Sequence, residues 1–269
     1  MHRIRSFYPT LGQSWVVVAV FLSATLGISF MISTVAALFG GAMIPGSWVT
    51  LAAYTVPFVF VAGFIYWLPS GLRLSAAPDA PVTSDVRRKL SPMLFVWLLL
   101  LAPLLSILTE PLTMWIPMPE YMKEMFGRLF QRDAVTLLMV AVAAPVCEEW
   151  MCRGVIAKGL LRHSTPGKAI VWSAFIFALI HLNPWQALPA FVFGLFLGYV
   201  YWKTQSLWPC IFIHFVINGL SFLLLFLFPE MDVNASMREI AGADYWKLYV
   251  MAALAAVYVG YLVKRLLGD

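Results

Sequence analysis

Several ionisable side chains stand inside stretches of the chain that are otherwise apolar, and their types could do chemistry together: Glu148, Glu149, Arg153, His181 and His214. A carboxylate in an apolar cavity can act as a general base toward water, and an imidazole can share that water or act as the acid. A further histidine and a carboxamide can donate hydrogen bonds to the oxyanion of a tetrahedral intermediate. Such groups are the equipment for hydrolysis of a peptide bond.

The spacing within the acidic stretch predicts different partners for its two carboxylates. Glu149 and Arg153 are separated by four positions with the acid first, which favours an ion pair on one helix face. Glu148 is rotated by about 100° from Glu149 on a helix, and the residue four positions after it is the uncharged Cys152. We therefore expect Glu148 to find its partner on another helix.

Two later segments also present a polar face. His214 and Asn218 are four positions apart, and Phe177 and His181 repeat that spacing. Each pair therefore lies on one side of its predicted helix.

The same residues allow a metal-based alternative. A set of Glu148, His181 and His214 matches catalytic zinc ligation with an open position, so a divalent metal such as zinc stays open as a cofactor. The chain has no HExxH motif, which excludes the usual zincin arrangement. No cofactor is certain from these residues.

Composition places these groups in a membrane protein. With 62% hydrophobic and 12% charged residues among 269, and a mean hydropathy of +0.85, the chain has too little polar surface for a soluble globule. The net charge of +5 is not gathered in basic clusters interleaved with aromatic residues, so we expect no nucleic-acid partner. Cys147, Cys152 and Cys210 all lie in apolar segments, and we expect packing residues rather than disulfides or a zinc cluster.

The hydrophobic pattern predicts an all-α polytopic membrane bundle of about eight transmembrane helices, with the active-site cavity inside it. The apolar run that starts at Trp15 is too long for a signal peptide, so we expect a retained first helix. The predicted helices lie at about 15–39, 47–68, 92–109, 133–158, 168–183, 186–202, 207–228 and 246–264.

We divide the chain into three parts on this pattern. The first, 1–131, holds three helices with a cytoplasmic linker at 69–91 and a short amphipathic helix at 118–130 in the outer interface. A plain solvated loop is the alternative at 118–130. The second part, 132–228, is the catalytic core, and 229–269 is an outer loop with the last helix.

Lysine and arginine indicate the orientation, because cytoplasmic loops are enriched in them. Most of them fall on the side where both termini would lie: Arg3, Arg5, Arg73, Arg87, Arg88, Lys89, Lys158, Arg162, Lys168, Lys203, Lys264 and Arg265. The opposite side carries Lys123, Arg128, Arg132, Arg238 and Lys247. We expect an integral multi-pass protein of a bacterial plasma membrane with both termini in the cytoplasm.

Depth in the membrane supports convergence of the polar groups. At about 1.5 Å per residue from the nearest cytoplasmic lysine, Glu148, His181 and His214 lie roughly 15, 20 and 17 Å deep. These depths agree within about one helical turn, so we expect the three side chains to meet near the middle of the membrane. We also expect access to the cavity from the cytoplasmic side.

The motifs resemble those of a known family. EExxxR at Glu148, Glu149 and Arg153, FxxxH at Phe177 and His181, and HxxxN at His214 and Asn218 occur in order on adjacent predicted helices. This set is similar to that of the CPBP intramembrane proteases, which include CAAX prenyl proteases of the Ras-converting-enzyme type and bacteriocin-processing or self-immunity proteins. The resemblance covers about residues 140–222.

The resemblance implies roles for these residues. Glu148 with His181 would activate water, and His214 with Asn218 would form the oxyanion hole. Glu149, Arg153 and Phe177 would be supporting residues. Members are commonly called metalloproteases, but oxyanion duty for His214 leaves two protein ligands, which favours a metal-free mechanism. The substrate would be a membrane-embedded or lipidated protein or peptide, and the oligomeric state is unknown.

Three other functions compete with this hypothesis. Polar groups can merely hold helices together, but an average gain of about 0.6 kcal/mol per interhelical hydrogen bond does not offset burial of Glu148. A proton-coupled transporter also uses acids and histidines in its helices, yet no inverted repeat is visible here. A non-catalytic immunity or partner protein would be expected to have lost part of the motif set, which is intact.

Overall fold

The computed structural model describes residues 9–38, 46–67, 90–228 and 237–268, and these form helices and no strand. The prediction of an all-α bundle is thereby confirmed. Most of the linker expected at 69–91 lies outside the described residues.

Six helical stretches in the described part of the chain are long and apolar enough to cross a membrane: Leu11–Leu38, Gly46–Trp67, Pro92–Leu112, Ala134–His163, Leu207–Leu227 and Gly242–Leu267. The predicted count of eight is not confirmed. The two remaining predicted segments form α8 (Pro166–Leu179) and α9 (Pro184–Thr204), which are not among these six. With 14 residues, α8 is roughly 21 Å long, whereas a hydrocarbon core is about 30 Å thick.

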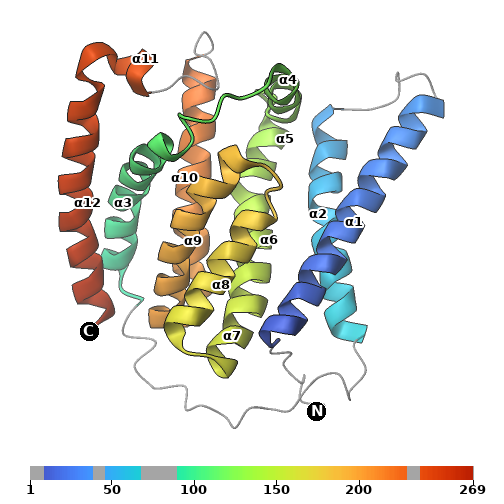
Figure 1. Ribbon diagram of the computed structural model, residues 1–269, viewed down its shortest axis with the longest axis horizontal. Helices are drawn as coiled ribbons and strands as arrows, with labels where there is room; N and C mark the ends of the chain where they lie inside the picture. Colours follow the sequence, from blue (N-terminus) through green and yellow to red (C-terminus); the bar gives the residue numbers. More distant parts are fainter. Residues whose placement is uncertain (1–8, 39–45, 68–89, 229–236, 269) are drawn as a thin grey trace.

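Helices α8 and α9 lie side by side and antiparallel in the middle of the molecule (Figure 1). Small residues let their backbones approach closely, as is common between membrane helices. A Cβ atom at Gly194 would lie 3.0 Å from Cα of Ala174, and one at Gly198 would lie 3.1 Å from Ile170. Helix α8 also packs against residues 150–157 of the helix that carries the two glutamates.

The helix from Ala134 to His163 is continuous but contains two π-helical segments, η3 and η4. Its parts are α5 (Ala134–Leu137), η3 (Leu138–Ala143), α6 (Ala144–Glu149), η4 (Trp150–Ala157) and α7 (Lys158–His163). A backbone carbonyl in each π-helical segment accepts a side-chain hydrogen bond from another helix: Val140 from Asn218 at 3.0 Å, and Cys152 from Ser173 at 3.1 Å. Such widened turns are frequent at functional sites, and here they flank both glutamates.

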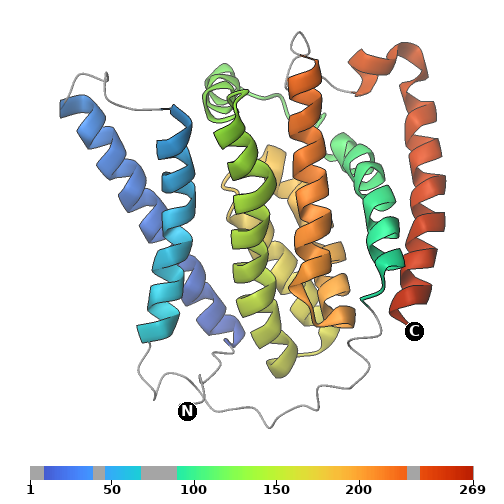
Figure 2. The same ribbon diagram turned by 180° about the vertical axis from the view of Figure 1, so that it is seen from behind.

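The remaining long helices surround this centre (Figures 1 and 2). Helix α10 (Leu207–Leu227) packs against α3 (Pro92–Thr109) and α6, and α12 (Tyr245–Leu267) packs on α3. On the other side, α1 (Leu11–Leu38) and α2 (Gly46–Trp67) pack as a pair, and α2 contacts α5 and α6. The hydrophobic core of the described part of the chain includes the fully buried side chains of Val17, Leu98, Met151, Ile156, Leu197 and Ile213.

Short helices connect the long ones. They are η2 (Glu110–Leu112), α4 (Glu120–Leu129), α11 (Met237–Ala241) and η5 (Gly242–Asp244). Helix α4 occupies the region where an amphipathic helix was expected at 118–130, with Met122 and Phe126 buried and Met125 and Leu129 exposed. Its placement in the membrane interface stays a prediction.

Asp133 fixes the start of the helix that carries the glutamates. Its Oδ1 accepts hydrogen bonds from the backbone N–H groups of Val135 and Thr136, at 2.8 and 2.9 Å, and its Oδ2 accepts one from the hydroxyl of Ser47 at the start of α2. The Ser47 hydroxyl, followed by these backbone donors, holds the pKa of Asp133 below its ordinary value. An N-cap carboxylate of this kind stabilises the first turn, and here it also joins α5 to α2.

We predict that Asp133→Ala lowers the midpoint of thermal unfolding by a few degrees at neutral pH, because it removes both the cap and the link to α2. A carboxyl group whose pKa is lower in the folded than in the unfolded protein stabilises the fold at pH values above its unfolded-state pKa. This stabilisation is lost as the pH falls through its folded-state pKa. The wild type should therefore lose this advantage only below the ordinary aspartate value of 3.8. Asp133→Asn, which keeps a capping oxygen without the charge, should lie between the two at neutral pH. Identical midpoints for all three proteins at pH 7 would contradict the assigned role.

Candidate active site

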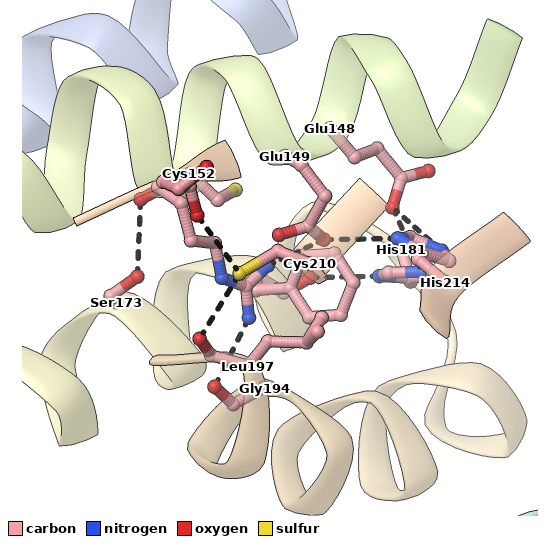
Figure 3. Close-up of polar contacts among 12 residues, drawn as sticks. Glu148, Glu149, Cys152, Ser173, His181, Gly194, Leu197, Cys210 and His214 are labelled. Atoms are coloured by element: carbon pink, nitrogen blue, oxygen red, sulfur yellow. Dashed lines mark hydrogen bonds and ion pairs between the residues drawn. The ribbon is translucent and has the colours of Figure 1, made fainter. Parts of the chain in front are cut away.

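A fully buried ionic cluster around Glu149 organises the site (Figure 3). Arg153 Nη1 donates to Glu149 Oε1 at 2.9 Å, and neither side chain is exposed. The guanidinium also donates to the Gly194 carbonyl of α9 at 3.1 Å and lies 4.3 Å from the ring centroid of Phe177 on α8. His214 Nδ1 on α10 meets the same Oε1 atom at 2.9 Å. The pair predicted from the i, i+4 spacing is present, and it connects four helical segments.

Glu148 has a different environment, as its position on the helix predicts. Its Oε1 accepts a hydrogen bond from the hydroxyl of Tyr54 on α2. Its Oε2 is buried without a hydrogen-bond partner in the described part of the chain and lies 3.9 Å from Nε2 of His181 and 3.9 Å from Nε2 of His214. These separations are too long for direct hydrogen bonds and leave room for a bridging water.

Hydrogen bonds orient the two imidazoles. His181 Nδ1 lies 2.8 Å from the backbone oxygen of Phe177, which can only accept, so Nδ1 carries a proton and a neutral ring has its lone pair on Nε2. His214 Nδ1 likewise donates to the Glu149 carboxylate. The aromatic rings of Phe177 and Phe193 pack edge-on against His214, with centroid separations of 5.7 and 5.6 Å. Both Nε2 atoms are thereby turned toward Glu148.

Asn218, one helical turn beyond His214, donates from Nδ2 to the Val140 carbonyl at 3.0 Å. This contact uses one of its two amide hydrogens. The structure therefore brings together Glu148, His181 and His214, and His181, His214 and Asn218 line the same cavity.

The cavity has a volume of about 300 Å³. Its polar lining consists of Ser106, Thr109, His181, Gln186, His214, Asn218 and Ser221, and Glu148 lies behind the imidazoles rather than on the wall. The lining residues come from the end of α3, the end of α8, the start of α9 and the middle of α10, so the cavity lies in the half of the bundle remote from the start of α1 and the end of α12 (Figure 1). With both termini in the cytoplasm, as the basic residues predict, this half would face away from the cytoplasm. The expected cytoplasmic access stays a prediction.

Tyr54 is the site residue that sequence reasoning missed. It lies 94 positions from Glu148 and belongs to none of the three motifs. A tyrosine in an apolar helix carries no spacing signal of its own, because such tyrosines are common. Only the packing of α2 against α6 brings its hydroxyl to the carboxylate.

The metal alternative would use Glu148, His181 and His214 as the ligands of a metal ion. Among the described residues, no group of three or more His, Cys, Asp and Glu side chains is arranged to hold one. Zinc ligands lie about 2.0–2.2 Å from the metal, so two ligands of one tetrahedral zinc lie about 3.4 Å apart. Oε2 of Glu148 is 3.9 Å from Nε2 of each imidazole, and its Oε1 is engaged by Tyr54. This ligand set stays a prediction.

Fold and site together define a membrane-embedded helical protein with a buried acid and imidazole cluster. Residues 130–220 match a family model described as "Rce1-like: Type II CAAX prenyl endopeptidase Rce1-like". The match spans all three motifs and confirms their resemblance to the CPBP protease family. The description of that family model is that of an endopeptidase. No curated protein and no solved structure matches the chain.

We predict that Arg153→Ala destabilises the protein by about 3–5 kcal/mol, because it leaves the Glu149 carboxylate buried without its charged partner. Glu148→Gln should cost far less, since the amide keeps an oxygen that can accept from Tyr54. The yield of monodisperse protein after detergent extraction and the midpoint of thermal unfolding measure both effects. The matched control is Glu120→Gln, which breaks an exposed ion pair with Lys123 and should change little.

Equal stability of Arg153→Ala and Glu148→Gln would contradict this division between a structural and a reactive glutamate.

Proposed function

We propose that the protein is an intramembrane endopeptidase that hydrolyses a peptide bond in a membrane-associated or lipidated, CAAX-like protein or peptide. One observation carries the proposal: the buried, unpartnered Oε2 of Glu148 faces Nε2 of both His181 and His214 at 3.9 Å. The family match over residues 130–220 supports the same reaction class.

Glu148 and His181 activate the nucleophilic water in this proposal. A water between Oε2 of Glu148 and Nε2 of His181 donates a hydrogen bond to each, because both atoms have free lone pairs. As the water oxygen attacks the scissile carbonyl carbon, its proton passes to Glu148. The same proton is then delivered to the nitrogen of the leaving amine, and the carboxylate is regenerated.

His214 and Asn218 stabilise the oxyanion. The second amide hydrogen of Asn218 is available, since the first is used by Val140. For His214 to donate from Nε2 while Nδ1 donates to Glu149, its ring must be protonated. Two buried carboxylates face one guanidinium here, so a proton on His214 balances the charge of the cluster. Donors fixed before the reaction stabilise the developing charge at little reorganisation cost.

The position of the cavity bears on the substrate. The basic residues predict that the start of α1 and the end of α12 face the cytoplasm. The cavity lies in the other half of the bundle, so we propose that the scissile bond enters from the non-cytoplasmic side. The apolar parts of the wall, including Leu105, Phe193 and Ile217, suit a hydrophobic segment of the substrate.

Cleavage by the purified protein in liposomes containing a library of membrane peptides tests the reaction. We predict that Glu148→Gln and His181→Ala each lower the rate at least about 100-fold through loss of water activation. Asn218→Ala should lower it about 100-fold through loss of one oxyanion donor. Glu120→Gln, which changes an exposed side chain that does not line the cavity, should cut at the wild-type rate.

Wild-type rates in both Glu148→Gln and His181→Ala would end the protease proposal. Preincubation with a metal chelator should leave cleavage intact. If the chelator abolished cleavage and added zinc restored it, the metal-free mechanism would be wrong and a zinc-dependent one would take its place. A wild type that cuts nothing while supporting proton-driven transport would favour the transporter alternative.

Single cysteines test the side of access. A membrane-impermeant thiol reagent added to intact cells should label Gln186→Cys, on the cavity wall, and should leave Lys168→Cys, at the exposed start of α8, unmodified. Inverted vesicles should reverse the pattern. Labelling of Gln186→Cys only in inverted vesicles would overturn the assignment.

A further inference from the structure

Helix α2 contributes one polar contact to the candidate site. The hydroxyl of Tyr54 donates to Oε1 of Glu148. Residues 46–67 lie outside the family match and outside all three motifs, so neither assigns a role to this helix. We propose that Tyr54 is a positioning residue that holds the Glu148 carboxylate in its reactive orientation, an inference that rests on the proposed function.

One hydrogen bond from the Tyr54 hydroxyl is enough to orient the Glu148 carboxylate. A glutamate side chain can rotate its two oxygens past each other unless one of them is held. With Oε1 occupied by Tyr54, Oε2 is the atom left facing His181 and His214. A hydrogen bond to an ionised acceptor is also among the stronger ones, so a single hydroxyl can hold the carboxylate in place.

No other residue in the described part of the chain makes a direct hydrogen bond to the Glu148 carboxylate. Glu149 has Arg153 and His214 within 2.9 Å, whereas both imidazoles stay 3.9 Å from Glu148. In the described part of the chain, Tyr54 therefore supplies the direct hydrogen bond of the proposed base.

Packing holds Tyr54 itself in place. Its ring lies 5.7 Å from that of Phe58, which in turn lies 4.8 Å from Phe21 on α1. Helix α1 is seated on α8 through Trp15, whose ring is 6.4 Å from Trp172 and 6.3 Å from Phe175 in edge-to-face contacts. The pair of helices outside the family match thus carries a group of the site on a fixed support.

The chain at the start of α1 also contacts the end of the helix that carries the glutamates. A Cβ atom at Gly159 would lie 2.4 Å from the backbone oxygen of Pro9, so the chain entering α1 touches the backbone of α7 directly. The start of α1 therefore contacts the glutamate-bearing helix at Gly159, near its end, and the start of α2 is hydrogen-bonded to it at Asp133, before its first turn. The Tyr54 hydroxyl is held between these two contacts.

Tyr54→Phe tests the proposal, because it removes the hydroxyl and keeps the ring. We expect kcat for a cleaved peptide to fall about 10-fold, the effect of about 1.4 kcal/mol, with KM unchanged. The matched control is Tyr199→Phe, which removes a buried hydroxyl that has no hydrogen-bond partner among the described residues and should leave kcat at the wild-type value. A merely structural role for Tyr54 would lower the amount of folded protein without this separation of kcat from KM.

A second measurement does not depend on turnover. A hydrophobic carbodiimide modifies carboxyl groups that are free to move and react, whereas Tyr54 holds Oε1 of Glu148. Mass spectrometry of the peptide containing residue 148 reports the rate of modification, with Glu148→Gln as the blank. Loss of the Tyr54 hydroxyl should speed modification of Glu148 several-fold, and Tyr199→Phe should not. If Glu148 were modified faster in Tyr54→Phe but the wild type cut no peptide, the proposed protease activity would be wrong and the positioning role of Tyr54 would still be supported. Unchanged kcat and unchanged modification in Tyr54→Phe would overturn the inference itself.

Discussion

The buried carboxylate of Glu149 is the interaction on which the rest of the site depends. A charge removed from water is tolerated only when opposite charges and hydrogen bonds surround it, and Arg153 and His214 meet this condition from 2.9 Å each. The guanidinium then reaches the Gly194 carbonyl of α9 and the Phe177 ring of α8. One ionic cluster therefore sets the positions of the helices that carry both histidines.

Satisfying Glu149 leaves its neighbour free for chemistry. Adjacent residues on a helix point about 100° apart, so Glu148 faces away from the guanidinium and toward Tyr54 and the two Nε2 atoms. Each imidazole has its other nitrogen engaged, His181 by a backbone oxygen and His214 by Glu149. Of the two adjacent glutamates, Glu149 is thus structural and Glu148 is the proposed reactive one. They differ because their side chains point in directions about 100° apart on the same helix.

Irregular and short helices give the site its shape. The π-helical segments on either side of α6 present backbone carbonyls to Asn218 and Ser173, which ties α10 and α8 to the glutamate-bearing helix. Because α8 has 14 residues, it ends inside the bundle, and His181 at its end lines the cavity instead of reaching a surface loop on the far side. Glycines on α9 permit the close approach of α8 that this arrangement needs.

The sequence alone determined the membrane class, the all-α fold, the Glu149–Arg153 pair and the meeting of Glu148 with His181 and His214, because residue spacing along a helix decides which side chains share a face. It did not determine the number of spanning helices, since hydrophobic segments of similar composition can form a short helix such as α8 or a full span. Tyr54, the π-helical turns and the end of the bundle that holds the cavity were decided by the tertiary structure. These features depend on how helices distant in sequence rotate and pack against one another, and periodicity within a single segment carries no information about that.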